Sequence, residues 1–67
     1  MHGDIMLGED ARKFMEIYSN IPVKARREIV AVVNGEPFSW NVARKEIDGD
    51  TELGRNILRK LKELKII

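Results

Sequence analysis

The sequence predicts a mainly α-helical fold, a compact bundle of about four helices with little or no β-structure. Two segments, residues 9–19 and 52–65, repeat apolar side chains with the period of an amphipathic helix. Short segments rich in Pro, Gly, Asp and Ser separate the remaining apolar runs. A chain of 67 residues is long enough for one domain only, so residues 1–67 are expected to fold as a unit.

The first predicted helix lies within residues 9–21. Its apolar side chains recur at i, i+3, i+4 and i+7 and therefore share one face: Ala11, Phe14, Met15 and Tyr18. Pro22 disfavours helical geometry at the residue before it and suits the first turn of a new helix. We therefore expect an N-terminal extra helix over residues 9–21, followed by a helical core over residues 22–67.

The second predicted helix covers residues 22–33, "PVKARREIVAVV". The proline at its start and its basic, Ala-containing first half favour a helix with one shared face: Ala25, Ile29, Val32 and Val33. The run "IVAVV" is β-branched and apolar on all sides, so a strand is the alternative. As a helix, this segment would be buried centrally or covered by a partner.

The dipeptide Asn34-Gly35 has two interpretations. Asn-Gly between apolar runs is the strongest short-range signal for a tight β-hairpin, whereas a Gly after an apolar run also ends helices. The residues after Ser39 have helical and not alternating spacing. We therefore expect a helix to end at Asn34-Gly35, and a short extended piece at residues 37–39 is compatible with this interpretation.

Two more helices complete the predicted bundle. Ser39 is a suitable N-cap for "WNVARKEI", in which Ala43 and Ile47 stack one turn apart with Val42 beside them. The polar turn "DGDT" at residues 48–51 offers two further caps. The last helix, residues 52–65, has an apolar stripe of Leu53, Ile57, Leu58, Leu61 and Leu64, and its opposite face is mostly basic. Gly54 inside this helix costs ~1 kcal/mol against Ala and indicates a close helix–helix or helix–backbone approach.

Composition excludes several classes of protein. The absence of cysteine excludes disulfides and thiolate metal sites, and a single histidine excludes a histidine metal centre. No apolar run reaches the ~20 residues of a membrane span, and no secretory leader is evident, so a soluble, cytoplasmic protein is expected. The high content of charged residues without Cys or Gln is typical of thermophile proteins. No catalytic constellation, cofactor motif or metal site is recognisable, and we expect no enzyme.

The order of the elements in residues 27–67, "REIVAVVNGEPFSWNVARKEIDGDTELGRNILRKLKELKII", resembles the winged helix-turn-helix domains of prokaryotic and archaeal transcription regulators. Phe38 occupies the place of the apolar residue that plugs the core of such domains. Ser39 starts the second helix, and Ala43 lies where two helices touch. The chain stops where the wing would begin, so the wing is expected to be absent or truncated.

The resemblance implies a DNA-binding protein, a transcription regulator whose last helix enters the major groove. Its outward residues would read bases: Thr51, Glu52, Arg55, Asn56 and Arg59. Basic side chains on this helix and before it would contact phosphates: Lys24, Arg26, Arg27, Arg44, Lys45, Lys60 and Lys62. A homodimer formed through the apolar face of residues 9–33 would double the phosphate contacts of a chain with a net charge of only +1.

The alternative is a protein–protein interaction module that uses the same fold without nucleic acid. Basic residues on an outward helix face are most often a solvated surface. The two hypotheses differ in one observable property, which is whether the basic side chains Arg55, Arg59 and Lys62 are open or are tied up by Glu52, Glu63 or a partner chain.

Overall fold

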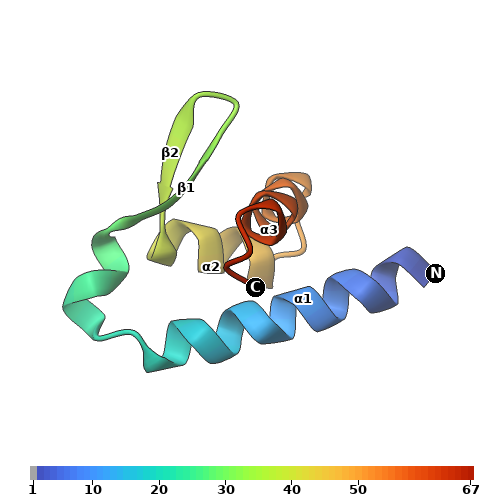
Figure 1. Cartoon of the computed structure of the whole chain (residues 1–67), viewed down its shortest axis with the longest axis horizontal. Coiled ribbons are helices and arrows are strands. Elements are labelled where there is room, and N and C mark those ends of the chain that lie inside the picture. The colour runs from blue at the N-terminus through green and yellow to red at the C-terminus, as the bar shows by residue number, and fades with distance from the viewer. Residues whose placement is uncertain (1) are drawn as a thin grey trace.

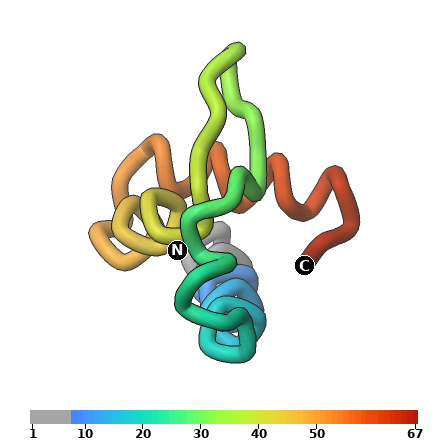
Figure 2. Tube along the Cα trace, turned by 90° about the vertical axis from the view of Figure 1, so that its left-hand side faces the viewer, coloured from blue at the N-terminus to red at the C-terminus, as the bar shows by residue number. Residues whose placement is uncertain are grey.

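A computed structural model describes the backbone of residues 2–67 and the side chains of residues 8–67. The elements follow one another as α1 (His2–Asn20), a 3-10 helix η1 (Val23–Arg27), β1 (Ile29–Val33), β2 (Glu36–Ser39), α2 (Trp40–Asp48) and α3 (Glu52–Glu63). Helices α2 and α3 form the middle of the molecule, α1 lies against one side of them, and the β1–β2 hairpin rises from the other side (Figures 1 and 2). The prediction of a compact, mainly helical domain is confirmed.

The core lies where α1, the hairpin and the α2–α3 pair meet. Its buried residues are Phe14, Tyr18, Ala31, Ala43, Ile47, Ile57, Leu58 and Leu61. The predicted faces of α1, α2 and α3 are therefore confirmed, with Ala11, Met15 and Leu53 partly buried beside them. Two residues depart from these predicted faces: Leu64 follows the last residue of α3 and is 51% exposed, and Val42 of α2 is 42% exposed.

The predicted helix over residues 22–33 is wrong. Pro22 precedes a five-residue 3-10 helix that ends at Arg27, and Glu28 is extended with φ −74° and ψ 152°. Residues 29–33 form β1, which pairs antiparallel with β2. The β-branched run therefore follows its strand preference, and the Pro start signal is satisfied by one short 3-10 turn.

Asn34-Gly35 is the turn of a hairpin and not the end of a helix. Val33 pairs with Glu36, so the loop has two residues. Both have positive φ, 54° for Asn34 and 81° for Gly35. A two-residue turn with positive φ at both positions is the type I′ turn, whose twist matches that of paired strands. The expectation of little or no β-structure is corrected accordingly.

The hairpin presents two faces of different character. Ala31 pairs with Phe38 on the face toward the core, whereas Val32 pairs with Pro37 on the opposite face. Val32 is 49% exposed, and Ile29 at the start of the strand is 55% exposed. A register irregularity between Ile29 and Ala31 marks a β-bulge at the base of the hairpin.

The turn between α2 and α3 is tied together at Glu46. The N–H of Thr51 donates to the Glu46 carbonyl at 3.2 Å and that of Asp50 to the Ile47 carbonyl at 3.1 Å, with Asp50 at φ 53°. These two bonds form a Schellman motif. A Cβ on Gly54 would overlap the same Glu46 carbonyl oxygen and lie 2.7 Å from its carbonyl carbon. Gly54 therefore lets α3 pack directly on the backbone of α2.

No helix within residues 2–67 has the length and apolar character that crossing a bilayer requires.

We expect Gly54→Ala to lower the free energy of unfolding by about 2 kcal/mol, because overpacking against backbone exceeds the gain in helix propensity of ~1 kcal/mol. For a domain of this size, that is a fall in melting temperature of roughly 10 °C. Gly8→Ala is the matched control, since a Cβ there meets nothing within 4 Å. It should raise the melting temperature by a few degrees. Thermal unfolding followed by circular dichroism measures both, and equal gains in the two variants would contradict the close approach.

The hairpin turn makes a second prediction. Gly35→Ala should cost about 1 kcal/mol because a Cβ is strained at positive φ, and Asn34→Ala should cost about 0.5 to 1 kcal/mol, because Asn adopts positive φ more readily than Ala does. At the end of a helix, residue 34 would be helical and Asn34→Ala would instead raise stability by roughly 0.5 kcal/mol, because Ala has the highest helix propensity. Urea unfolding of both variants separates these cases.

Candidate nucleic-acid interface

A groove runs between the hairpin and α3. It has a volume of about 300 Å³ and is lined by Val32, Val33 and Asn34 from the hairpin side and by Asn56, Arg59, Lys60 and Glu63 from α3. The hairpin rises on the side of α3 that faces away from α1 (Figures 1 and 2), so the mouth of this groove is not covered by α1. The groove lies between α3, which the sequence predicts as the recognition helix, and the hairpin, which the sequence prediction did not assign to the site.

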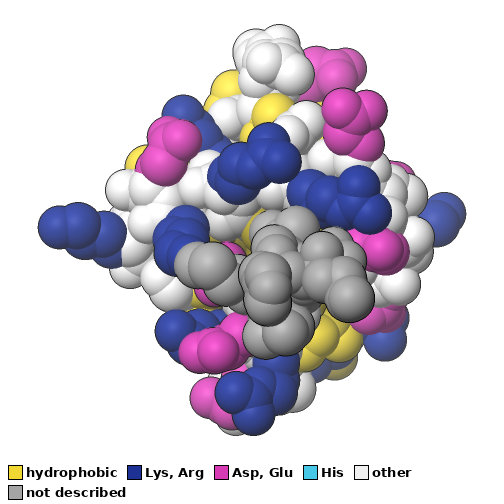
Figure 3. Space-filling view, turned by 90° about the vertical axis from the view of Figure 1, so that its right-hand side faces the viewer, with side chains coloured by type: hydrophobic (Ala, Val, Ile, Leu, Met, Phe, Trp, Pro, Cys, Tyr) yellow, Lys and Arg dark blue, Asp and Glu magenta, His cyan; other side chains and the backbone are white. Residues whose placement is uncertain are grey.

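The surface beside this groove is of mixed charge. Figure 3 shows Lys and Arg side chains below the tip of the hairpin, with Asp and Glu side chains to either side. Helix α3 contains four basic residues and two acidic residues, Glu52 and Glu63. Helix α3 therefore carries a net positive charge of only two units.

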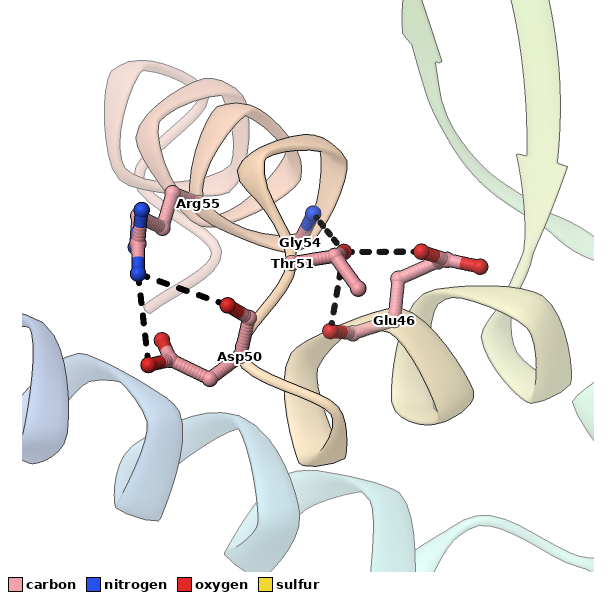
Figure 4. A network of polar contacts seen from close by, with 5 residues as sticks. All are labelled: Glu46, Asp50, Thr51, Gly54 and Arg55. Atoms are coloured by element: carbon pink, nitrogen blue, oxygen red, sulfur yellow. Dashed lines mark hydrogen bonds and ion pairs between the residues drawn. The ribbon is translucent and has the colours of Figure 1, made fainter.

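Two of the predicted base-reading residues are engaged within the α2–α3 turn (Figure 4). The Thr51 hydroxyl accepts the Gly54 N–H at 2.9 Å and lies 2.7 Å from Glu46 Oε1, so it serves as the N-cap of α3. Arg55 Nη2 lies 3.2 Å from Asp50 Oδ2 and 3.3 Å from the Asp50 carbonyl oxygen. These bonds hold the Arg55 side chain back against the turn and use part of its donor capacity.

Asn56 and Arg59 lie together on the wall of the groove. Arg59 Nη1 donates to Asn56 Oδ1 at 2.8 Å. This bond orients the guanidinium and the amide side by side, leaving the Asn56 NH₂ as a donor next to it. Glu52, the remaining member of the predicted base-reading set, is exposed in the first turn of α3.

Two of the predicted phosphate-contacting arginines belong to a structural cluster around Tyr18. The guanidinium of Arg26 lies 4.3 Å from the centre of the Tyr18 ring and that of Arg44 lies 5.4 Å from it. Arg26 also donates to the Ile21 carbonyl, and Arg44 pairs with Asp48 at 3.6 Å. The Tyr18 hydroxyl donates to Asn41 Oδ1 at 2.6 Å. This cluster joins α1, η1 and α2, away from the groove.

The other predicted phosphate contacts are scattered. Lys62 Nζ lies 3.6 Å from Asp10 Oδ2, a buried carboxylate of α1, and so helps to hold α1 against α3. Lys24 and Arg27 are exposed on η1 and Lys45 on α2; in Figure 1, η1 lies at the far end of the molecule from α3. Lys60 alone among the seven lines the groove.

Asn34 is the site residue that sequence reasoning missed. Its position in a type I′ turn brings it to the groove, opposite the α3 residues. The signal that could have found it was the Asn-Gly dipeptide, which predicts a hairpin tip projecting from the fold.

A second cavity of about 440 Å³ lies between α1 and the α2–α3 turn. Its lining includes Ala11, Ile47 and Leu58 together with the Asp50–Arg55 ion pair. Among the residues whose side chains are described, no three His, Cys, Asp or Glu residues gather where they could hold a metal ion.

Comparison of the chain with protein-family models, with curated proteins and with solved structures found no match.

Proposed function

We propose that this protein binds duplex DNA through α3 and the neighbouring hairpin, as a small transcription regulator of the helix-turn-helix kind. The observation that carries the proposal is the polar groove in which Arg59, Lys60 and Asn56 of α3 face Asn34 of the hairpin. Arg, Lys and Asn are the side chains that contact phosphates and base edges most often. The capped α2–α3 pair supports the proposal because it is the arrangement that presents a second helix to a DNA groove.

The charges set the expected strength of binding. Arg55 and Lys62 already face Asp50 and Asp10, so fewer cations are available to phosphates than the sequence suggests. Each phosphate contact contributes a salt-dependent term through counterion release. A single chain should therefore bind mixed-sequence DNA weakly, in the micromolar range, and pairing of two chains on one duplex would strengthen it.

The alternative function is protein–protein interaction without nucleic acid. Two observations favour it: part of the basic face is engaged internally, and apolar side chains remain exposed at 73% for Val23, 55% for Ile29 and 49% for Val32. Val23, Ile29 and Val32 are the large apolar side chains of residues 9–33 that are exposed and could form a homodimer interface. Phe14, Tyr18 and Ala31 of the same range face the core. The groove residues weigh against it, because charged side chains are depleted in the centres of protein interfaces.

The DNA proposal predicts that the protein binds a fluorescein-labelled mixed-sequence duplex at low salt and that affinity falls as salt rises. Lys60→Glu should weaken binding by roughly tenfold, because it reverses a charge inside the groove. Fluorescence anisotropy measures both effects.

Lys13→Glu is the matched control, since Lys13 is an exposed residue of α1, on the other side of the molecule from the hairpin. It makes the same change in net charge and should leave affinity nearly unchanged. Absence of any salt-dependent binding at tens of micromolar protein, or equal loss in both variants, would refute the proposal.

A further inference from the structure

We infer that the groove between the hairpin and α3 is a seat for one sugar-phosphate strand, so that the two elements straddle a DNA backbone and Arg59 contacts phosphate and not a base edge. This inference rests on the proposed function and assigns roles within the same site. It differs from the sequence expectation, in which Arg59 and Asn56 read bases from the outward face of the last helix.

The first argument is shape. Base edges form the floor of a DNA groove, and a protein reaches them with a convex ridge such as the outer surface of a helix. The surface that carries Asn56, Arg59 and Lys60 is instead one wall of a hollow of about 300 Å³, and the hairpin forms the other wall. A hollow between two ridges fits a convex partner, and the sugar-phosphate backbone is the ridge that separates the two grooves of DNA.

The second argument is the chemistry of the walls. Arg59 and Lys60 supply the positive charge, and Asn56 and Asn34 supply amide donors from opposite sides. The bond from Arg59 Nη1 to Asn56 Oδ1 at 2.8 Å holds the guanidinium beside the groove wall, not extended from the helix. Glu63 also lines the hollow and reduces its net charge to one positive unit. Phosphates carry one negative charge per nucleotide, which this lining matches.

The third argument concerns the two elements that flank the groove, α3 and the tip of the hairpin. With a backbone strand between them, α3 would lie in one groove of the duplex and the tip of the hairpin in the adjacent one. The tip consists of Asn34 and Gly35, which are uncharged, exposed and fixed by the type I′ turn. A narrow, uncharged tip held in one conformation suits insertion into a confined groove, since little side-chain entropy is lost on binding.

The inference is tested by substituting both walls and measuring affinity across sequences and salt concentrations. Three labelled duplexes of unrelated sequence are titrated by anisotropy at several salt concentrations with the full chain. Arg59→Gln removes the charge on α3. Asn34→Asp places a negative charge on the hairpin wall with little change of shape, and Asp tolerates positive φ as Asn does.

Loss of a phosphate contact weakens binding by the same factor on every sequence and reduces the slope of log Kd against log salt by about one. We expect Arg59→Gln to show both effects, with a roughly fivefold loss at low salt. Asn34→Asp should also weaken binding equally on the three duplexes. Arg12→Gln is the matched control for Arg59→Gln, because it makes the same substitution at an exposed arginine of α1, on the other side of the molecule from the hairpin, and it should leave the slope unchanged.

Three results would overturn the inference. If Arg59→Gln weakens binding to one duplex and not to the others, Arg59 reads a base, and the proposed function survives without the backbone seat. If Asn34→Asp has no effect while Arg59→Gln does, α3 acts alone and the hairpin is not a wall of the site. If the unaltered protein fails to bind any duplex, the proposed function itself fails, and the inference with it. Thermal unfolding of each variant confirms that affinity is compared between folded proteins.

Discussion

The backbone of Glu46 is the point on which the arrangement of the C-terminal half depends. Its carbonyl oxygen accepts the N–H of Thr51 at 3.2 Å, and the Cα of Gly54 packs against the same group. The carboxylate of Glu46 lies 2.7 Å from the Thr51 hydroxyl, which in turn caps α3. The end of α2, the turn and the start of α3 are therefore joined through one residue. The direction of α3, and with it the wall of the groove, is set here.

Much of the helical structure could be predicted because its signals are local. Apolar spacing placed Phe14 and Tyr18 on one face of α1 and Ile57 and Leu61 on one face of α3, and the N-caps of α2 and α3 were visible as Ser39 and a residue of the "DGDT" turn. Residues 22–35 were misinterpreted because their sequence signals are compatible with two structures, a helix and a β-hairpin. A five-residue β-branched run is too short for its period to distinguish helix from strand, and Gly35 needs positive φ in both a helix end and a type I′ turn.

The candidate site was predicted only in part, for a different physical reason. Charge and helical spacing identify Arg55, Arg59 and Lys62 as an outward basic set, but the groups that engage them come from elsewhere in the chain. Asp10 reaches Lys62 only because α1 docks on α3. In the same way, the hairpin brings Asn34 to α3 through a tertiary contact that no spacing in the sequence encodes. A sequence shows which residues are basic, whereas the fold determines which of these side chains are already engaged by acidic groups.

The contact between Phe14 and Trp40 has an optical consequence. Trp40 is the only tryptophan in the chain, and its ring stacks on Phe14 of α1 at 5.6 Å with the planes 27° apart. Intrinsic emission therefore reports whether α1 is seated on α2, whereas ellipticity sums over all three helices. Coincident melting curves from the two signals would identify one cooperative unit, and an earlier change in emission would identify α1 as a separately detaching element. Trp40 is thus an intrinsic fluorescent reporter of the contact between α1 and the α2–α3 pair.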